Sequence, residues 1–192
     1  MAKQYHDAVA LRLRDMGVDE RAARSFVAQA QVTDYAPRHT LLRTGMRSNL
    51  VGYLLDGHVR FHATDENGDE WVRFFARPGS FIGSIRTLLY DVPAEQGADC
   101  ITKCKMLVVP AERFGQIYAD LHVRTQLQDL IIQQLLLISQ ERADLLPMAA
   151  RERYLYFREH YADVEQLVLK SDIASFLGIR QQSLSRILRE FK

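Results

Sequence analysis

Polar and basic side chains that could bind a ligand gather on one face of a predicted helix near the end of the sequence. They are Gln181, Gln182, Ser183, Ser185, Arg186 and Arg189. A glutamine can form two hydrogen bonds with the major-groove edge of adenine, and an arginine can form two with that of guanine. Ser183 and Arg189 suit phosphate contacts, which set register without reading sequence. The pattern predicts a DNA-reading face; the alternative is the solvated outer face of an ordinary helix pair.

Two short helices joined by a tight turn would position this face. Ser171 suits the N-cap of the first helix, because its hydroxyl can accept a backbone hydrogen bond. The apolar residues of that helix are Ile173, Phe176 and Leu177. Gly178 sits where the turn requires a positive φ angle. A second helix is expected from Arg180 or Gln181, with its inner residues at i, i+3, i+4 and i+7. The inner residues are Leu184, Ile187, Leu188 and Phe191.

A long helix is predicted over residues 122–146, roughly 37 Å at ~1.5 Å per residue. One seam of this helix has the 4-3-4-3 spacing that keeps a face directed toward a partner helix. The seam residues are Ile131, Leu135, Ile138, Arg142 and Leu145. Pro147 ends the helix just before the next helical segment. The spacing favours a dimerisation helix that links two domains, and the alternative is a core helix lying against the preceding strands.

Short runs rich in aromatic and β-branched residues occupy positions 31–109, after about thirty residues with helical periodicity. Asn67 and Gly68 separate the runs at 59–63 and 71–75 and predict a tight hairpin. We therefore expect an α+β fold: an N-terminal antiparallel β-roll (a double-stranded β-helix) with flanking helices, the long helix, and a small helix-turn-helix domain. The expected roll interior contains Tyr53, Phe61, Trp71, Phe74 and Phe75, some of which could instead line an apolar pocket.

The composition is that of a soluble globular protein, with 47% hydrophobic and 26% charged residues in a chain of 192. The formal net charge of +1 gives no global sign of a nucleic-acid partner, so positive potential would have to concentrate on one face. The N-terminal residues do not follow the signal-peptide pattern, and no window approaches the ~18 apolar residues of a membrane span. We therefore expect a cytoplasmic protein without a membrane partner.

Metal and thiol chemistry is not indicated by the spacing of the histidines and cysteines. If Cys100 and Cys104 share a strand, they lie roughly 13 Å apart at ~3.3 Å per residue, too far for a disulfide or a shared metal. His58 and His62 have the same separation, and an iron–sulfur centre would need about four thiolates. We expect no catalytic residues, no metal and no cofactor. An enzyme built on the roll, and a module that binds a protein partner, are the alternatives.

Two segments together resemble the Crp–Fnr superfamily of bacterial transcription regulators. IASFLGIRQQSLSRIL is similar to the helix-turn-helix of that superfamily, and GYLLDGHVRFHATDENGDEWVRFFARPGSFIG resembles its cyclic-nucleotide-binding-type β-roll. The resemblance covers nearly the whole chain. It implies an effector-sensing domain at 1–121, a dimerisation helix at 122–146 and a DNA-binding domain at 147–192. The implied partners are a double-stranded DNA operator and a second copy bound through 122–146, with RNA polymerase as a further candidate.

The resemblance places the base-reading positions at Gln181, Gln182, Ser185 and Arg186, and Arg186 matches the arginine of the superfamily. Gln182 stands where the superfamily usually has an acidic residue that accepts a hydrogen bond from cytosine. We therefore expect an operator with an altered base preference at that step, with adenine as the candidate base. The sequence ends at Lys192 without the small β-hairpin wing that commonly follows, which predicts weaker or more salt-sensitive DNA binding.

The expected effector site departs further from the pattern of the superfamily. Members that bind cyclic AMP present a glutamate to the ribose and an arginine–serine pair to the phosphate. The corresponding positions here are Ser84, Ala94 and Glu95, next to Gly83. Because Ala94 has no side-chain donor and Glu95 would repel an anion, we expect no response to cyclic AMP in the usual way. The effector stays unknown, and Arg86 and Lys103 leave another anion open.

Overall fold

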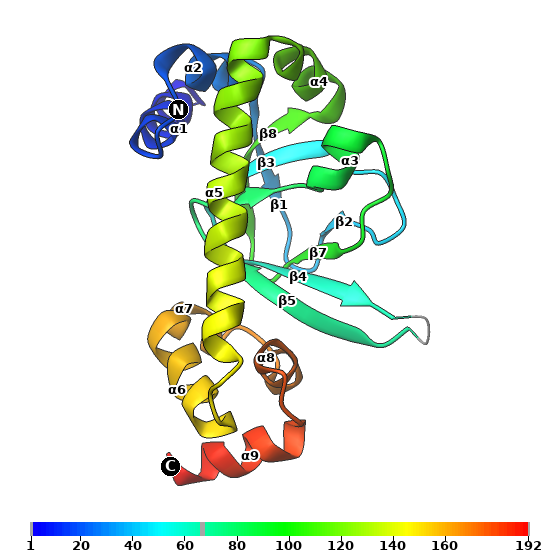
Figure 1. Ribbon diagram of the computed structural model, residues 1–192, viewed down its shortest axis with the longest axis vertical. Helices are drawn as coiled ribbons and strands as arrows, with labels where there is room; N and C mark the ends of the chain where they lie inside the picture. Colours follow the sequence, from blue (N-terminus) through cyan, green and yellow to red (C-terminus); the bar gives the residue numbers. More distant parts are fainter. Residues whose placement is uncertain (1, 66–67, 192) are drawn as a thin grey trace.

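The computed structural model describes residues 2–65 and 68–191. The long helix α5 (Leu121–Leu145) runs along the molecule and joins its two ends (Figure 1). The β-roll lies beside this helix, with α1, α2 and α4 at one end and α6 to α9 at the other. The observed helix begins and ends one residue before the predicted 122–146. Asp120 caps it by accepting a hydrogen bond from the backbone N–H of Val123.

The β-roll consists of two four-stranded antiparallel sheets, in the orders β1-β8-β3-β6 and β2-β7-β4-β5. Its elements are β1 (Gln31–Tyr35), β2 (Thr40–Leu42), β3 (Leu50–Asp56), β4 (Val59–Thr64), β5 (Glu70–Ala76), β6 (Phe81–Ile82), α3 (Ile85–Tyr90), β7 (Gly97–Cys100) and β8 (Cys104–Pro110). The predicted α+β fold with an antiparallel roll is confirmed. The roll begins after α1 (Ala2–Asp15) and α2 (Glu20–Ala28) and is followed by α4 (Ala111–Ala119).

The hairpin predicted between residues 59–63 and 71–75 is formed by β4 and β5, whose paired residues extend from Val59↔Ala76 to Thr64↔Glu70. Gly68 has the positive φ angle of +87° expected in this turn. Asn67 lies outside the described residues. The ladder shifts between Phe61 and His62, because β5 contributes one residue more than β4 at that point.

Apolar side chains fill the interior of the roll. Phe61 and Phe74 stack with their ring centroids 4.2 Å apart, and both pack in the cluster that contains Leu54, Ile82 and Met106. A side-chain carbon added at Gly52 would lie only 2.1 Å from Met106 Cε, so the backbone of β3 is in close contact with the methionine.

Three of the five aromatic residues expected inside the roll lie elsewhere, which corrects the prediction. Tyr53 is buried in the cluster that the roll forms with the N-terminal helices. Trp71 is 41% exposed, and Phe75 is buried in a different cluster, together with Val72 and residues of the C-terminal helices. Strand alternation would put Val72 and Phe75 on opposite faces. The extra residue at the register shift in β5 places both on the same side, which faces α8.

The cysteines are free, as expected, but the separation estimated for them does not apply. Cys100 is the last residue of β7 and Cys104 the first residue of β8, so they do not share a strand. The chain reverses between them and brings the two buried, free thiols into hydrogen-bond contact. The pKa of Cys100 is raised by that hydrogen bond and by burial, and the pKa of Cys104 is lowered by the same hydrogen bond. Distance along a strand does not apply where the chain turns.

Four helices form the C-terminal helical unit, which we define as residues 150–190. They are α6 (Ala150–His160), α7 (Ala162–Glu165), α8 (Lys170–Leu177) and α9 (Gln181–Glu190). Their buried core includes Tyr154, Phe157, Phe176 and Leu184, and Leu145 from the end of α5 joins it. This unit positions the polar residues singled out in the sequence.

Candidate nucleic-acid interface

The helix pair α8 and α9 is joined by a three-residue turn at Gly178. Gly178 has a φ angle of +63°, in the left-handed region that favours glycine, and its N–H donates to carbonyls of the last turn of α8. Ile179 N donates to Ala174 O at 3.0 Å and completes the turn. The prediction of Ser171 as the N-cap is wrong: α8 begins at Lys170, with Leu169 at the N-cap, and Ser171 lies exposed in the first turn.

The inner side of the pair is sealed by apolar residues. Those predicted to lie inside are nearly all buried, with exposed fractions of 3% for Ile173, 1% for Phe176 and 0% for Leu184. Leu188 is half-buried, and Phe191 is 37% exposed, with the guanidinium groups of Arg151 and Arg158 each 5.3 Å from its ring centroid. Because the apolar side is fully used, the pair can present only its polar side to a ligand.

The outer side of α9 carries the predicted polar set together. Gln181, Gln182, Arg186 and Arg189 are exposed, and Ser183 and Ser185 are half-buried. A shallow pocket on this surface is lined by five of the six, Gln181, Gln182, Ser185, Arg186 and Arg189. Among residues 2–65 and 68–191, neither Arg186 nor Arg189 has an ion-pair partner. Two guanidinium groups and two side-chain amides on α9, at the end of the molecule, are therefore free to bind a ligand (Figure 1).

Arg153 is a supporting residue that sequence reasoning missed. Its guanidinium donates to three backbone carbonyls, those of Met148 (3.0 Å), Leu177 (2.9 Å) and Leu146 (3.2 Å). A cation at the C-terminus of α8 is favoured by the carbonyls that have no partner within the helix. Arg153 thereby fixes the turn ahead of α9. No sequence signal identifies such a residue, because its partners are backbone atoms up to 24 residues away.

The four predicted effector-site residues lie at the two ends of the segment that contains α3, and their polar groups are engaged within the chain. Gly83 follows β6, and Ser84 caps α3 by accepting hydrogen bonds from Thr87. Ala94 is buried, with its N–H donating to Met46 O and its carbonyl accepting from Gly45 N, both at 2.8 Å. Glu95 forms an ion pair with Arg86, one of the two cations that the sequence left open for an anion.

The outer face of α5 differs from the predicted seam. Arg142 and Leu145 turn toward their own chain: Arg142 Nη1 donates to Phe176 O at 2.7 Å, and Leu145 is 5% exposed. Another seam with 4-3 spacing is exposed instead, and we call it the α5 seam. It consists of Thr125, Asp129, Ile132, Leu136, Ser139, Ala143 and Leu146. The C-terminal helical unit covers the last turns of the predicted seam, which spacing alone could not reveal.

Comparisons with known proteins agree with this architecture. Residues 32–120 match the family described as the cyclic nucleotide-binding domain. The transcriptional activatory protein AadR of Rhodopseudomonas palustris is 26% identical over 172 residues, which cover 84% of this chain and 71% of AadR.

Solved structures extend the similarity of fold to about nine tenths of the chain. The c-di-GMP-responsive global regulator CLP of Xanthomonas campestris gives a TM-score of 0.70 at 16% identity, covering 90% of this chain and 91% of CLP. A transcriptional regulator of the Crp/Fnr family from Eubacterium rectale gives a TM-score of 0.73 at 14% identity, covering 91% of this chain and 84% of its own.

The chain therefore has a cyclic nucleotide-binding domain joined by a long helix to a C-terminal helical unit. Its sequence and fold are similar to those of Crp–Fnr-type regulators, which confirms the resemblance seen in the sequence. No helix in the described part of the chain is long and apolar enough to cross a membrane. Within the same residues, no group of three or more histidine, cysteine, aspartate or glutamate side chains could hold a metal ion.

Proposed function

We propose that this protein is a homodimeric transcription regulator that binds double-stranded DNA with the outer face of α9. The observation that supports it most is the free polar surface of α9 above a sealed apolar side, with Arg186 and Arg189 unpaired within the described residues. Gln181, Gln182, Ser185 and Arg186 would read base edges, and Ser183 and Arg189 would hold phosphates. Such a protein would act in the cytoplasm, with RNA polymerase as a candidate partner.

We propose that each of the three parts of the chain has its own role. Residues 1–121 form the sensing domain, α5 and its ends (122–146) the dimerisation helix, and residues 147–192 the DNA-binding domain. We propose the α5 seam as the dimer contact, because Ile132 and Leu136 are 54% and 63% exposed and the small Ser139 and Ala143 allow two helices to approach closely. A two-fold dimer would then place its two α9 helices for half-sites about 34 Å apart.

We further propose that the protein does not bind cyclic AMP in the usual way. A cyclic phosphate needs donors or a cation facing it. Ser84 and the backbone of Ala94 are already used in internal hydrogen bonds, Glu95 is anionic, and apolar side chains fill the interior of the roll. Calorimetric titration with cyclic AMP and cyclic GMP should show no binding at micromolar concentrations. A micromolar Kd for either nucleotide would contradict this proposal.

Replacement of Arg186 tests the DNA-binding face directly. Arg186→Ala should cost about 1–3 kcal/mol of binding free energy, roughly 5- to 150-fold in Kd, and relax base preference at one position, because a bidentate contact to guanine is lost. The measurement is fluorescence anisotropy with a duplex selected by the wild-type protein from random DNA.

Arg113→Ala is the matched control, since Arg113 is equally an exposed arginine on a helix but lies on α4, at the opposite end of α5. The control should bind like the wild type. Equal affinity of the Arg186→Ala variant and the wild type would exclude Arg186 as a base-reading residue.

A further inference from the structure

The C-terminal helical unit is attached to the β-roll at two places. At the first, Val72 and Phe75 of β5 are buried against α8: the Phe75 ring lies 5.3 Å from that of Phe176, and Val72 N donates to Ser175 Oγ at 2.8 Å. At the second, Arg77 Nη1 donates to His160 O at 2.6 Å, at the end of α6, and His58 Nε2 lies 3.0 Å from Asp163 Oδ2 of α7. Loss of either attachment would leave the unit held by the other.

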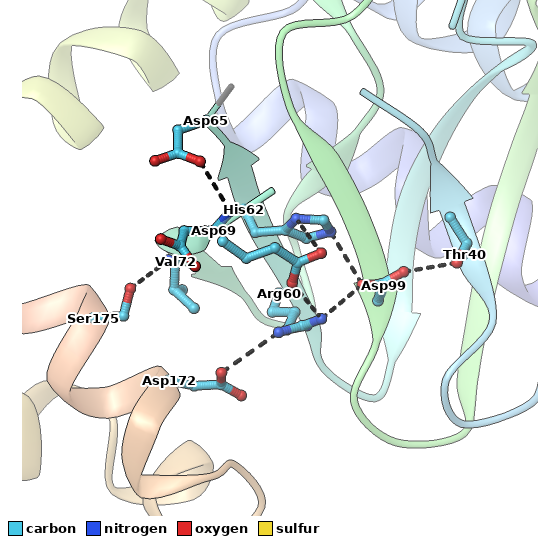
Figure 2. Close-up of polar contacts among 10 residues, drawn as sticks. Thr40, Arg60, His62, Asp65, Asp69, Val72, Asp99, Asp172 and Ser175 are labelled. Atoms are coloured by element: carbon cyan, nitrogen blue, oxygen red, sulfur yellow. Dashed lines mark hydrogen bonds and ion pairs between the residues drawn. The ribbon is translucent and has the colours of Figure 1, made fainter. Parts of the chain in front are cut away.

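A charged network accompanies the first attachment (Figure 2). Arg60, on β4, extends one guanidinium nitrogen toward Asp172 of α8, with Nη1 at 3.4 Å from Oδ1. Its other terminal nitrogen lies 3.1 Å from Glu70 Oε2 and 3.1 Å from Asp99 Oδ2. The side chains of Arg60 and Asp172 are only 26% and 17% exposed. Arg60 therefore connects two strands of the roll to the first helix of the α8–α9 pair.

The roll side of this network is held in place by further contacts. Thr40 Oγ1 donates to Asp99 Oδ1 at 2.8 Å, and the His62 ring lies 3.1 Å from Asp99 Oδ2 and 3.4 Å from Glu70 Oε1. Gly97 makes room for the imidazole, because a side-chain carbon there would lie 2.5 Å from two of its ring atoms. The carboxylates that orient Arg60 thus have little freedom to move.

The bond to Asp172 contributes orientation more than stability. Burial raises the pKa of Asp172, and the nearby charge of Arg60 offsets that effect only in part. A raised pKa means that the fold favours the neutral form of the carboxyl group. The attraction between Arg60 and Asp172 therefore does not fully offset the free energy of removing the charged carboxylate from water. A buried ion pair of this kind can nevertheless select one geometry of a contact over others.

We propose that Arg60 is a positioning residue for DNA binding: its bond to Asp172 fixes α8 on the roll so that the outer face of α9 points away from the molecule. This inference rests on the proposed DNA-binding function. In the observed arrangement, α8 lies between the roll and α9, and α9 is at the far end of the molecule (Figure 1). Without the bond, α8 would be held on the roll only by the packing of Val72 and Phe75 and by the hydrogen bond to Ser175, which fix its direction less strictly. The two α9 helices of a dimer would then lose their fixed spacing.

A double-mutant cycle tests this proposal. Arg60→Gln and Asp172→Asn should each weaken binding of the selected duplex by about 2- to 30-fold, the range over which residues remote from a ligand modulate binding. The double variant should bind no more weakly than the weaker single variant, because both changes remove the same bond. Arg60→Lys, which keeps the charge, should restore part of the affinity.

The possible outcomes separate the two proposals. Asp172→Asn should not lower the free energy of unfolding, so a loss of affinity in that variant cannot be assigned to misfolding. If Asp172 instead contacts DNA, its replacement would have the same effect with and without Arg60, and the positioning role would be refuted. Wild-type affinity in both single variants would also refute it. If the wild-type protein selects no DNA, the proposed function itself fails.

Discussion

Single arginines in this chain serve different purposes, and their partners distinguish them. Arg153 donates to three backbone carbonyls and holds a turn, whereas Arg60 lies among carboxylates at a contact between two parts of the molecule. Arg186 and Arg189 have no ion-pair partner in the described part of the chain. A guanidinium that is both exposed and unpaired keeps all its donors for an external acceptor, which is the basis for assigning DNA contacts to α9.

Asp99 gives the network a defined dependence on pH. Burial acts to raise its pKa, but hydrogen bonds from His62 and Thr40 and the charges of His62 and Arg60 lower it to about 2. Because the pKa is lowered in the folded state, the ionised carboxylate stabilises the fold above pH ~4, and this stabilisation is lost as the pH falls toward 2.

Asp99→Asn should therefore lower the free energy of unfolding by about 2 kcal/mol at pH 7, and by progressively less between pH 4 and 2. Urea unfolding at a series of pH values measures the difference. Asp34→Asn is the matched control, as Asp34 is exposed on β1, and it should change stability by less than about 0.5 kcal/mol. A cost of Asp99→Asn that did not change with pH would contradict the assignment.

Among the elements, α5 packs against different parts of the molecule at its two ends and is exposed between them. Val123, Leu127 and Leu130 are buried against the N-terminal helices, while Leu145 packs into the C-terminal helical unit. Between these contacts the α5 seam is exposed, with Leu136 near its middle. The exposed apolar residues of the seam are Ile132, Leu136, Ala143 and Leu146, and a partner helix that covered them would remove them from water.

A charge placed on the α5 seam should disrupt the dimer. Leu136→Glu would bring two carboxylates together at the contact of two α5 helices, and we expect it to convert the protein to a monomer in sedimentation velocity experiments. Leu11→Glu is the control, because Leu11 of α1 is 58% exposed, close to the 63% of Leu136, but lies away from α5. An unchanged dimer in the Leu136→Glu variant would show that the contact lies elsewhere.

Elements with a strong local pattern could be predicted from the sequence. The helix pair, the turn at Gly178 and the long helix depend on periodicity and on one glycine, and they were found within one or two residues of their predicted positions. The inner and outer faces of α9 also follow from spacing alone. The sequence alone therefore identifies the polar residues that we propose to read DNA.

Features that depend on distant parts of the chain could not be predicted. The side of β5 that carries Phe75 depends on a register shift, and the exposed seam of α5 depends on which turns α8 covers. Cys100 and Cys104 meet because the chain reverses between them. In each case the local rule, whether strand alternation, helical spacing or distance along a strand, is overridden by tertiary contacts.

In the molecule as a whole, the β-roll lies beside α5 and the α8–α9 pair lies at the end of α5, with α8 next to β5 (Figure 1). The contacts of Arg60, Val72 and Phe75 with the C-terminal helical unit provide a direct route from the roll to α9. A change in the roll would therefore reach α9 through a few residues of β4 and β5. This arrangement supports a regulator in which sensing and DNA binding are mechanically connected.

The most direct test of DNA binding by α9 is selection of duplexes by the wild-type protein from a random-sequence pool, followed by titration of the best duplex at several salt concentrations. We expect a two-fold symmetric site whose half-sites are about one helical turn apart, with affinity falling linearly with salt on logarithmic axes. Failure to enrich any sequence, with no salt-dependent binding of duplex DNA, would contradict it.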